Sequence, residues 1–309
     1  MKKESQKYYE DHAYYNDIVT LNTQYTMASP YVDTTVVKTP ESVIKGIYHS
    51  RYNRFTSEDY LLNFRADNRY FGFAMGVSRF SNRDALLSFA SKKTAEEALP
   101  SIKLPKPKRI KAAFSAVMES RRSLRNFGGG MSLQELSTVL LHSCGVTGKM
   151  MLNEPEQDAE AIYLRSQASG GGFYPVTLYI VAWNVDGLER GIYEYYPYHH
   201  SIRCVREGFE LEELRNLAGF GDIKIENSAF CFIYVYNLYI NSHKYGDAGA
   251  AYAFIEAGEM AFGAQLSATA LGCGGCDIGG YEKRYIEKML KIDGLSEQVI
   301  HFTIFGKGE

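Results

Sequence analysis

Five runs of apolar and aromatic residues in the second half of the chain have the length and composition of β-strands. The first, residues 176–183, reads Val-Thr-Leu-Tyr-Ile-Val-Ala-Trp and is followed by an Asp-Gly turn. Its β-branched and aromatic side chains suit a half-buried or buried strand. Four more strands are expected at residues 191–196, 201–205, 229–236 and 299–305.

Helical periodicity is found before, between and after these strands. A helix is expected near residues 110–122, and another begins at Ser132, where Ser132 and Glu135 have capping-box spacing, and ends at Gly145. Residues 248–272 predict a long helix that is apolar on nearly all sides, which implies burial on all sides. Its small residues would allow a second helix to approach closely, as in a symmetric dimer. Helices with a contiguous group of strands predict the α+β class.

A proline-rich segment interrupts the chain before the first of these helices. Residues 99–108 contain three prolines with interleaved lysines, which exclude a helix or a central strand and indicate an extended linker or domain boundary. We therefore expect an N-terminal extension at residues 1–109 and a main domain at residues 110–309. Many tyrosines lie in the extension, where they would suit a partner or peptide interface or, equally, half-buried sheet and loop positions. Residues 94–97 form a further capping box.

Composition and charge exclude some classes of function. The chain has 309 residues, of which 45% are hydrophobic and 23% charged, as in ordinary globular proteins. A formal net charge of -2, with no basic aromatic stripe, argues against a nucleic-acid partner. We expect no secretory signal, because residues 1–5 lead into polar and aromatic residues rather than an apolar run. We expect no membrane span, because the long apolar helix carries Glu256 and Glu259. Five cysteines, an odd number, favour reduced thiols in the cytoplasm.

Basic and glycine-rich segments supply the candidate ligand-binding chemistry. Residues 120–127 read Ser-Arg-Arg-Ser-Leu-Arg-Asn-Phe, and such guanidiniums and hydroxyls can bind phosphate, although a solvated basic helix end is the equal alternative. Glycine runs at residues 169–175 and 272–280 would permit close backbone approach to a ligand. No G-x-G-x-x-G follows a strand, and Gly148-Lys149 lacks the first P-loop glycine, which disfavours a pyrophosphate site. A mononucleotide with one phosphate and a planar ring would use these parts.

Two other motifs contain residue types found in redox or metal sites. Cys273 and Cys276 have C-x-x-C spacing, but they follow a helix in a glycine-rich loop and no second pair is present for zinc. His199 and His200 fall between two expected strands without a second ligand cluster. We interpret them as surface turn residues and predict no metal site.

Several motifs in the right order resemble FMN-dependent enzymes of the nitroreductase fold, and in particular the SagB-type, or McbC-like, azoline dehydrogenases. Residues 121–125 look like the R-R-S-x-R signature that grips the FMN phosphate and ribityl chain, and residues 169–175 resemble the S-G-G-x-x-Y-P loop. The resemblance extends from about residue 100 to the end of the chain. Further matching segments are residues 99–105, 191–195, 244–246, 256–258, 271–272 and 278–280.

The resemblance implies an α+β fold with a central, mostly antiparallel sheet flanked by helices, FMN as cofactor, and a homodimer. It implies oxidation of thiazolines or oxazolines to thiazoles or oxazoles on a ribosomally made peptide. The implied partners are the azoline-containing precursor peptide and cyclodehydratase subunits. Two alternatives stay open: an NAD(P)H-dependent nitro- or quinone reductase, and a non-catalytic subunit that binds the peptide or the cyclodehydratase, against which the complete arginine signature argues.

The resemblance also assigns roles to residues. Lys244 and Tyr245 match the family's adjacent lysine and tyrosine, so we expect them to be the proton-transfer pair; without the resemblance they would be ordinary loop residues. A lysine can act as a base only if desolvation or a neighbouring positive charge lowers its pKa. Of the three arginines in residues 121–125, Arg122 is the one most readily assigned a structural role instead of a role in cofactor binding. The expected FMN contacts are Arg121, Arg122, Ser123 and Arg125 at the phosphate end, Ser169, Gly170 and Gly171 near the ring, and Gly272, Gly274, Gly275 and Lys307.

Three positions depart from the family pattern. Ala168 stands where proline often precedes the loop serine, Glu259 where histidine often follows E-A-G, and Asp277 where proline often precedes I-G-G. None of the three removes a cofactor-binding group, so the departures concern the shape of the substrate pocket.

Overall fold

The computed structural model describes residues 60–61, 64, 71–80, 96, 98–151 and 161–309. The chain divides into two units, Met1–Arg65 and Ala66–Glu309, and the fold described below is that of the second. In the first unit, the ring centroids of Tyr60 and Phe64 lie 5.9 Å apart. The early tyrosines of the predicted extension and most of the capping box at residues 94–97 lie outside the described residues.

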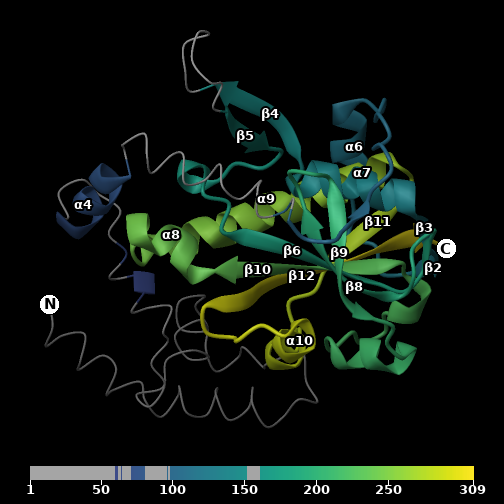
Figure 1. Ribbon diagram of the computed structural model, residues 1–309. Coiled ribbons are helices and arrows are strands. Elements are labelled where there is room, and N and C mark those ends of the chain that lie inside the picture. The colour runs from purple at the N-terminus through teal and green to yellow at the C-terminus, as the bar shows by residue number, and fades with distance from the viewer. Residues whose placement is uncertain (1–59, 62–63, 65–70, 81–95, 97, 152–160) are drawn as a thin grey trace, which may run out of the picture. The chain divides into compact units, whose positions relative to one another are not determined.

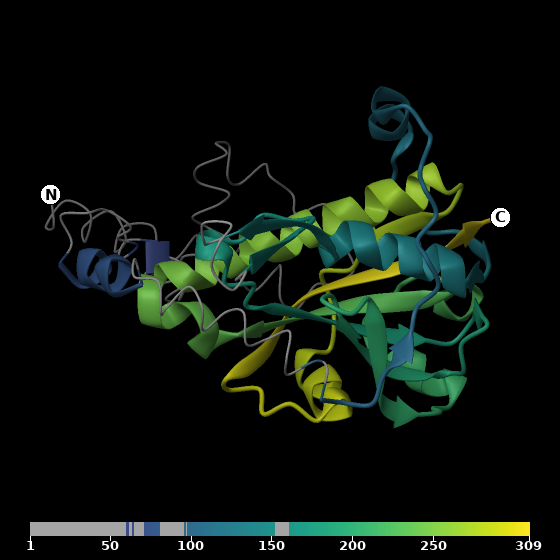
Figure 2. The ribbon, with the colours of Figure 1, turned by 45° about the horizontal axis from the view of Figure 1, so that its top comes forward.

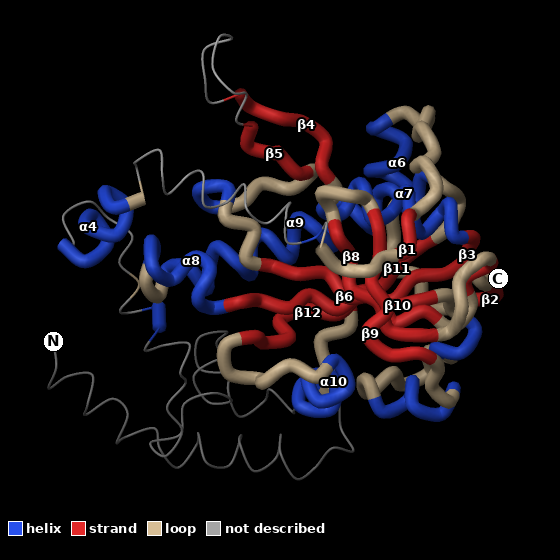
Figure 3. The backbone as a smooth tube through the Cα atoms, in the orientation of Figure 1, coloured by secondary structure: helices blue, strands red, loops and turns tan. Residues whose placement is uncertain are grey.

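An antiparallel sheet of eight strands forms the centre of the second unit (Figures 1 and 3). Every strand pair in it is antiparallel, which confirms the predicted α+β fold with a mostly antiparallel sheet. The strands, in spatial order, are β1 (Ile102–Lys103), β9 (Ser201–Glu207), β8 (Gly191–Tyr196), β6 (Val176–Ala182), β10 (Phe230–Asn237), β12 (Glu297–Gly308) and β11 (Gly274–Asp277), and β2 (Phe127–Gly129) also pairs with β12.

Two smaller pairs of strands complete the β-structure. The strand β3 (Met131–Ser132) runs parallel to β7 (Val185–Asp186). The strands β4 (Val146–Met151) and β5 (Ala161–Arg165) form an antiparallel pair, and β5 leads into the glycine run at residues 169–175.

The five predicted strands are present, and two segments expected to be irregular are strands as well. Residues 274–277, predicted to be a loop, form β11 because β12 offers a free edge with which they pair. The proline-rich segment is not a free linker: β1 pairs with β9, and Leu104 is 5% exposed in the core. Prolines are tolerated there because β1 is an edge strand. The domain boundary at residues 109/110 stays a prediction.

Two layers of helices cover the sheet, as Figure 2 shows. The helices α7 (Leu133–Cys144) and α9 (Ala248–Ala270) pack on one face, and α10 (Lys283–Leu290) packs on the other. Three more helices are α4 (Phe71–Arg79), α6 (Phe114–Ser120) and α8 (Leu238–Tyr245). Among the described residues, no helix combines the length and the hydrophobicity that crossing a bilayer requires.

The predicted start of α7 is confirmed, whereas α6 is shorter than predicted. Ser132 accepts a hydrogen bond from the Glu135 backbone N–H, and the Glu135 side chain accepts one from the Ser132 N–H, which is the predicted capping box. The segment before α6 is held in an extended form, since the Lys108 N–H donates to the Thr138 hydroxyl over 2.8 Å. The helix α6 therefore begins at Phe114 rather than near residue 110.

The expectation that α9 is buried on all sides is wrong. One side packs small residues and Met260 against the sheet and α7, and Ala253, Ala257 and Met260 are 1% exposed or less. The other side leaves large apolar groups in solvent, with Phe254 58% and Ile255 59% exposed. An exposed apolar strip of this kind marks an interaction surface more often than a monomer's free surface.

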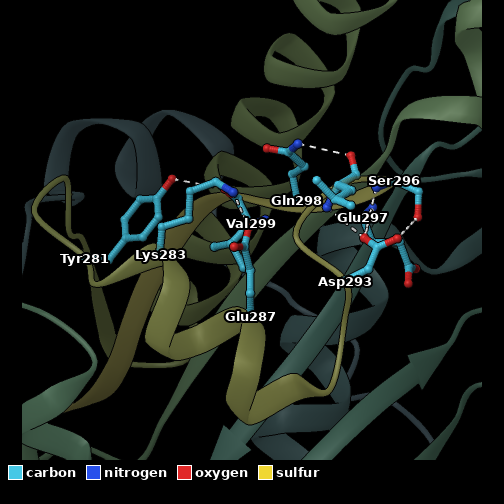
Figure 4. Close-up of polar contacts among 9 residues, drawn as sticks. Tyr281, Lys283, Glu287, Asp293, Ser296, Glu297, Gln298 and Val299 are labelled. Atoms are coloured by element: carbon cyan, nitrogen blue, oxygen red, sulfur yellow. Dashed lines mark hydrogen bonds and ion pairs between the residues drawn. The ribbon is translucent and has the colours of Figure 1, made fainter.

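Acidic side chains join α10 to the last strand of the sheet (Figure 4). Glu287 accepts a hydrogen bond from the Val299 backbone N–H over 3.2 Å and also from the Lys283 ammonium of its own helix. In the turn before β12, the Asp293 carboxylate accepts from the backbone N–H groups of Ser296 (2.9 Å) and Glu297 (3.0 Å). Hydrogen bonds from Ser296, Glu297 and Leu295 together lower the pKa of Asp293 to about 2.

Candidate active site

The glycine loop, residues 169–175, lies against the C-terminal end of α8. Gly171 has a φ of +66°, which favours glycine, and a Cβ atom there would lie 2.6 Å from the Tyr245 hydroxyl and 3.0 Å from Lys244 Nζ. A side chain at this position would therefore collide with both predicted catalytic groups. The fold brings the glycine loop and the Lys244–Tyr245 pair together from positions more than 70 residues apart.

Lys244 and Tyr245 occupy the last turn of α8, not a loop. The Lys244 ammonium lies 5.3 Å from the centroid of the Phe173 ring, which belongs to the glycine loop. The Tyr245 ring meets Phe173 edge-on at 6.0 Å and Tyr252 of α9 edge-on at 5.0 Å. Phe73 of α4, from the predicted N-terminal extension, adds a ring 6.1 Å from that of Tyr245. The rings of Phe73, Phe173 and Tyr252 thus form an aromatic wall around the pair. The polar atoms of Lys244 and Tyr245 lie toward the glycine loop.

Burial shifts the pKa values of the two residues in opposite senses. Desolvation lowers the pKa of Lys244, because burial disfavours the ammonium form. Desolvation, and to a smaller degree Tyr252, raises the pKa of Tyr245. Lys244 therefore loses its proton more readily than an exposed lysine, while Tyr245 keeps its proton at neutral pH. These are the properties of a base and of a hydrogen-bond donor or acid, respectively.

Two carboxylates of α9 fix the backbone before and within the glycine loop. The Ser169 hydroxyl donates to Glu256 over 2.6 Å and accepts from the Tyr174 backbone N–H over 2.9 Å. Glu256 is 2% exposed. One turn further along α9, Glu259 accepts a hydrogen bond from the Ala168 backbone N–H over 2.8 Å. Ser169, predicted to contact the cofactor, is therefore already engaged in holding the loop together.

The Ala168–Glu259 contact joins two of the three departures from the family pattern. A proline at position 168 has no N–H to donate, so the Glu259 carboxylate can accept this hydrogen bond only because residue 168 is not proline. We expect Ala168→Pro and Glu259→Ala each to lower the free energy of unfolding by about 1 kcal/mol, and the double variant by less than the sum. Chemical denaturation of the four proteins measures this. Glu212→Ala, which alters an exposed carboxylate elsewhere, is the control, and strict additivity would contradict the coupling.

The arginine segment runs beside the edge strand β11, immediately after α6. Ser123 forms a β-bridge with Gly275, and the Leu124 backbone N–H donates to the Gly275 carbonyl over 3.0 Å. Ser123 and Arg125 are exposed. The sequence prediction of a basic cluster at a helix end is confirmed, but residues 121–125 are extended rather than helical.

A further cation reaches this edge from the end of β12. Lys307 is about half exposed, with its Nζ 3.7 Å from a Glu135 carboxylate oxygen. Its strand pairs with β2 at Gly129, a few residues after Arg125. Arg121, Arg125 and Lys307 therefore belong to neighbouring segments of one sheet edge. We call this edge, after these three residues, the basic sheet edge; all three side chains are at least partly accessible to solvent.

Arg122 differs from the other two arginines of its segment. Its guanidinium donates to the carbonyl oxygens of Glu119 (2.9 Å) and Arg121 (2.7 Å), which are unpaired groups at the end of α6. A cation at a helix C-terminus is also favoured by the helix dipole. The Arg122 side chain therefore has a structural role at the end of α6, as its place in the sequence suggested. Its contact with a cofactor stays a prediction.

The predicted glycines beyond α9 each have a local structural reason. Gly272 has a φ of +76° and ends the helix, with the Cys273 N–H bonded to the Ala268 carbonyl over 2.9 Å. A Cβ at Gly274 would lie 2.8 Å from Leu124, and one at Gly275 would lie 2.6 Å from the Phe305 ring. Gly274 and Gly275 thus let the arginine segment and the core pack closely on β11.

Asp277, the third departure, links the arginine segment to α9. It accepts hydrogen bonds from Gln265 (2.7 Å), Thr303 (2.7 Å) and His301 (3.0 Å). Burial opposes its ionisation, but these hydrogen bonds outweigh burial and lower the pKa of Asp277. Gln265 in turn accepts from Arg121 over 3.2 Å, so Asp277 and Gln265 together orient that guanidinium.

The sequence analysis did not identify Gln265, and it used Glu256 as part of the matching segment 256–258 and as an argument against a membrane span, without assigning it a role in the site. The available signal was a polar residue inside an otherwise apolar helix, because a buried polar group requires a partner. Both lie on α9, nine residues apart, which corresponds to about 14 Å along the helix axis. The helix therefore supports the glycine loop at one end and the arginine segment at the other.

The cysteines and histidines take structural positions. All five cysteines are free, and desolvation raises the pKa of Cys273 to about 11, which disfavours a reactive thiolate. His200 lies in a turn, as predicted, but its ring is partly buried rather than free at the surface: its Nε2 lies 2.7 Å from the Ser137 hydroxyl and its Nδ1 lies 2.8 Å from the Tyr195 hydroxyl. Burial lowers the pKa of His200 to about 4. The described residues contain no cluster of three His, Cys, Asp or Glu placed to bind a metal.

Comparison with known proteins identifies the family. Residues 118–307 match the nitroreductase family, and the chain belongs to it. The protein MJ1384 of Methanocaldococcus jannaschii, named as a nitroreductase, is 31% identical over 192 residues, which cover 62% of this chain and 89% of that protein.

Solved structures show the same fold. A nitroreductase-family protein of Ralstonia eutropha superimposes with a TM-score of 0.54 at 21% identity, covering 69% of this chain and 91% of that one. A chain of the Escherichia coli microcin synthetase McbBCD complex, solved with truncated pro-MccB17 bound, superimposes with a TM-score of 0.51 at 18% identity, covering 78% of this chain and 99% of that one. These structures show the fold, and membership of the nitroreductase family gives the general class, oxidoreductase.

Proposed function

We propose that the protein is an FMN-dependent azoline dehydrogenase that oxidises thiazoline or oxazoline rings of a modified peptide to thiazoles or oxazoles. The observation that carries the proposal is the convergence of Lys244 Nζ and the Tyr245 hydroxyl on Gly171 of the glycine loop. The adjacent lysine and tyrosine, and the loop they contact, are the features in which the sequence resembles this branch of the family. The fold shared with a microcin synthetase chain over 99% of that chain supports the same branch.

The residues present fit FMN. A single phosphate requires a few donors of positive charge, and Arg121, Arg125 and Lys307 provide them at one accessible sheet edge, with the exposed Ser123 between the arginines. Arg121 is already oriented by Gln265. We assign the predicted contacts of Ser169, Gly170 and Gly171 to the ring end, where the glycine loop offers backbone rather than side chains. Bound FMN would supply a two-electron acceptor for the hydride that leaves the azoline.

The chain's own residues would handle the proton. Oxidation of an azoline removes one hydrogen as hydride and one as a proton from the neighbouring ring carbon. Lys244, with its lowered pKa, would accept that proton at Nζ. Tyr245, which stays protonated, would hold the ring by donating a hydrogen bond from its hydroxyl. The aromatic wall formed by Phe73, Phe173 and Tyr252 would exclude water from the pair.

The proposal includes partners. The substrate would be a precursor peptide already cyclised by cyclodehydratase subunits, as the resemblance implies. A second copy of the chain would cover the apolar strip of α9, where Phe254, Ile255 and Phe262 are between 45% and 59% exposed.

The visible absorbance of the purified protein tests the cofactor. We expect a yellow protein whose spectrum is that of oxidised flavin, with FMN released on denaturation. An azoline-containing peptide should then lose two hydrogens in the mass spectrum when it is incubated with the flavoprotein. A colourless protein that takes up no FMN would contradict the enzyme assignment.

A second candidate function is an NAD(P)H-dependent nitro- or quinone reductase. The 31% identity to a protein named as a nitroreductase favours it. Anaerobic mixing with NADPH separates the two candidates. Rapid bleaching of the flavin would favour the reductase, whereas slow or absent bleaching together with peptide oxidation would favour the dehydrogenase.

A further inference from the structure

A cavity of about 250 Å³ lies beside the glycine loop and separate from the basic sheet edge. Its walls come from the segment before β1, from the strands β5, β6 and β8, and from α8. Drug-sized ligands and cofactors occupy pockets of about 300–1,000 Å³, so this cavity suits a group of side-chain size and not FMN. Ile240 in its wall precedes Lys244 by one turn of α8, and Tyr174 in its wall follows Phe173 of the loop.

Arg165 supplies the cavity with a buried positive group that has a hydrogen bond with the Tyr198 side chain and one donor left unsatisfied. Its guanidinium lies between two tyrosine rings, 4.5 Å from the centroid of Tyr174 and 5.1 Å from that of Tyr198. Its Nε–H is buried and has no hydrogen-bond partner among the described residues. A buried donor without a partner costs about 1–3 kcal/mol, more when it is charged, and a bound anion would remove that cost.

Among the described residues, the two carboxylates of the cavity wall are engaged by other groups, although Arg165 also acts electrostatically on Glu96. Glu194 is engaged by Arg203, whose guanidinium donates to it at 2.6 and 3.2 Å. Glu96 accepts the Tyr198 backbone N–H over 2.9 Å. The rest of the wall is largely apolar or aromatic, including Leu99, Cys144, Val176, Leu178, Tyr195 and Ile240.

We infer that this cavity binds a carboxylate attached to a small apolar group that is flat or short. Arg165 is the residue that binds the carboxylate. An arginine fork matches two carboxylate oxygens, and the tyrosine rings match a flat or short apolar body behind them. The carboxylate belongs either to a free small acid or to an acidic side chain of a bound peptide. The site stands apart from the flavin chemistry, so its test needs neither FMN turnover nor an azoline.

Glu96 should make the affinity depend on pH. Burial, with a smaller contribution from Glu194, raises the pKa of Glu96 to about 7 against the opposing effect of Arg165. Glu96 also acts electrostatically on the thiol of Cys144 and on the hydroxyls of Tyr195 and Tyr196, and burial raises the pKa of all three, so they stay neutral at pH 6–8. Below pH 7 Glu96 is protonated and can donate to an incoming carboxylate; above pH 7 it is anionic and repels it.

Benzoate is the probe, and the full-length protein is titrated by thermal shift at constant ionic strength, with neutral benzamide as the matched control. We expect saturable stabilisation by benzoate and at least tenfold weaker binding by Arg165→Gln. Arg206→Gln, which alters a partly exposed arginine paired with Glu213, should bind benzoate like the wild type. Equal binding of benzamide, or unchanged benzoate affinity in Arg165→Gln, would overturn the proposal.

A second variant keeps the test decisive if Arg165→Gln does not fold. Glu96→Gln removes the anion at pH 8, so it should bind benzoate more tightly than the wild type at pH 8 and about equally at pH 6. Equal affinities of the two proteins at pH 8 would contradict the site.

The blocked peptide acetyl-Gly-Glu-Gly-amide identifies the source of the carboxylate. Competition with benzoate indicates a peptide side chain, and binding of benzoate alone indicates a free acid. Both of these results support the carboxylate site.

Discussion

Lys244→Ala is expected to stop azole formation while the protein stays folded and retains FMN. Removal of a positioned general base costs about 10²–10⁴-fold in rate. The side chain is lost from the last turn of α8, where it touches the Phe173 ring and Gly171 but no residue of the basic sheet edge. Turnover is measured as the loss of two hydrogens from the peptide, and FMN content by absorbance.

Tyr245→Phe tests the other half of the pair without changing the aromatic wall. The ring contacts with Phe173 and Tyr252 stay, and only the hydroxyl beside Gly171 is removed. His243→Ala, at the preceding exposed position of the same helix, is the control and should be close to wild type. If both Lys244→Ala and Tyr245→Phe turn over normally, the assignment of the pair is wrong.

The pH profile gives a third readout of the same assignment. Because burial lowers the pKa of Lys244, its neutral, basic form increases as pH rises through a pKa below 10.5. The rate should therefore rise with pH along an ascending limb that Lys244→Ala abolishes. Tyr245, whose pKa is raised, should add no titration near neutral pH.

The elements that the sequence predicted correctly are those specified by local patterns. The capping box of Ser132 and Glu135 and the β-branched run at residues 176–182 require no information from distant segments. Residues 274–277 show the limit of such reasoning. Two glycines suggested a loop, but the segment is a strand because β12 provides the paired edge and the glycines make room for Leu124 and Phe305.

The candidate site was predictable as a set of residue types but not as an arrangement. The resemblance named Lys244, Tyr245 and the glycine loop, yet no local pattern places Glu259 on the Ala168 backbone, 91 positions away. The same is true of His200, whose two hydroxyl partners come from α7 and β8. The exposed side of α9 was missed for a different reason: hydrophobicity predicts that a surface will be covered, but not whether the chain itself or another molecule covers it.

The three arginines at residues 121–125 are expected to contribute differently to FMN binding, which gives the second prediction with a large effect. Arg125→Ala and Arg121→Ala should each weaken FMN binding by about 10–100-fold, since a hydrogen bond to a charged group contributes about 1.5–3 kcal/mol. Arg122→Ala is the matched control in the same segment, because its guanidinium is occupied by the carbonyl oxygens of Glu119 and Arg121. It should lower stability modestly and leave FMN affinity within a few-fold of wild type.

Fluorescence titration of FMN with the apoprotein measures these affinities. Gln265→Ala refines the test, since Gln265 connects Arg121 to Asp277 and touches no predicted FMN contact besides Arg121. Its loss should weaken FMN binding less than Arg121→Ala, and should add little when combined with Arg121→Ala, because the two act through one guanidinium. Loss of FMN in Arg122→Ala as severe as in Arg125→Ala would show that the phosphate is held at the end of α6 rather than along β11.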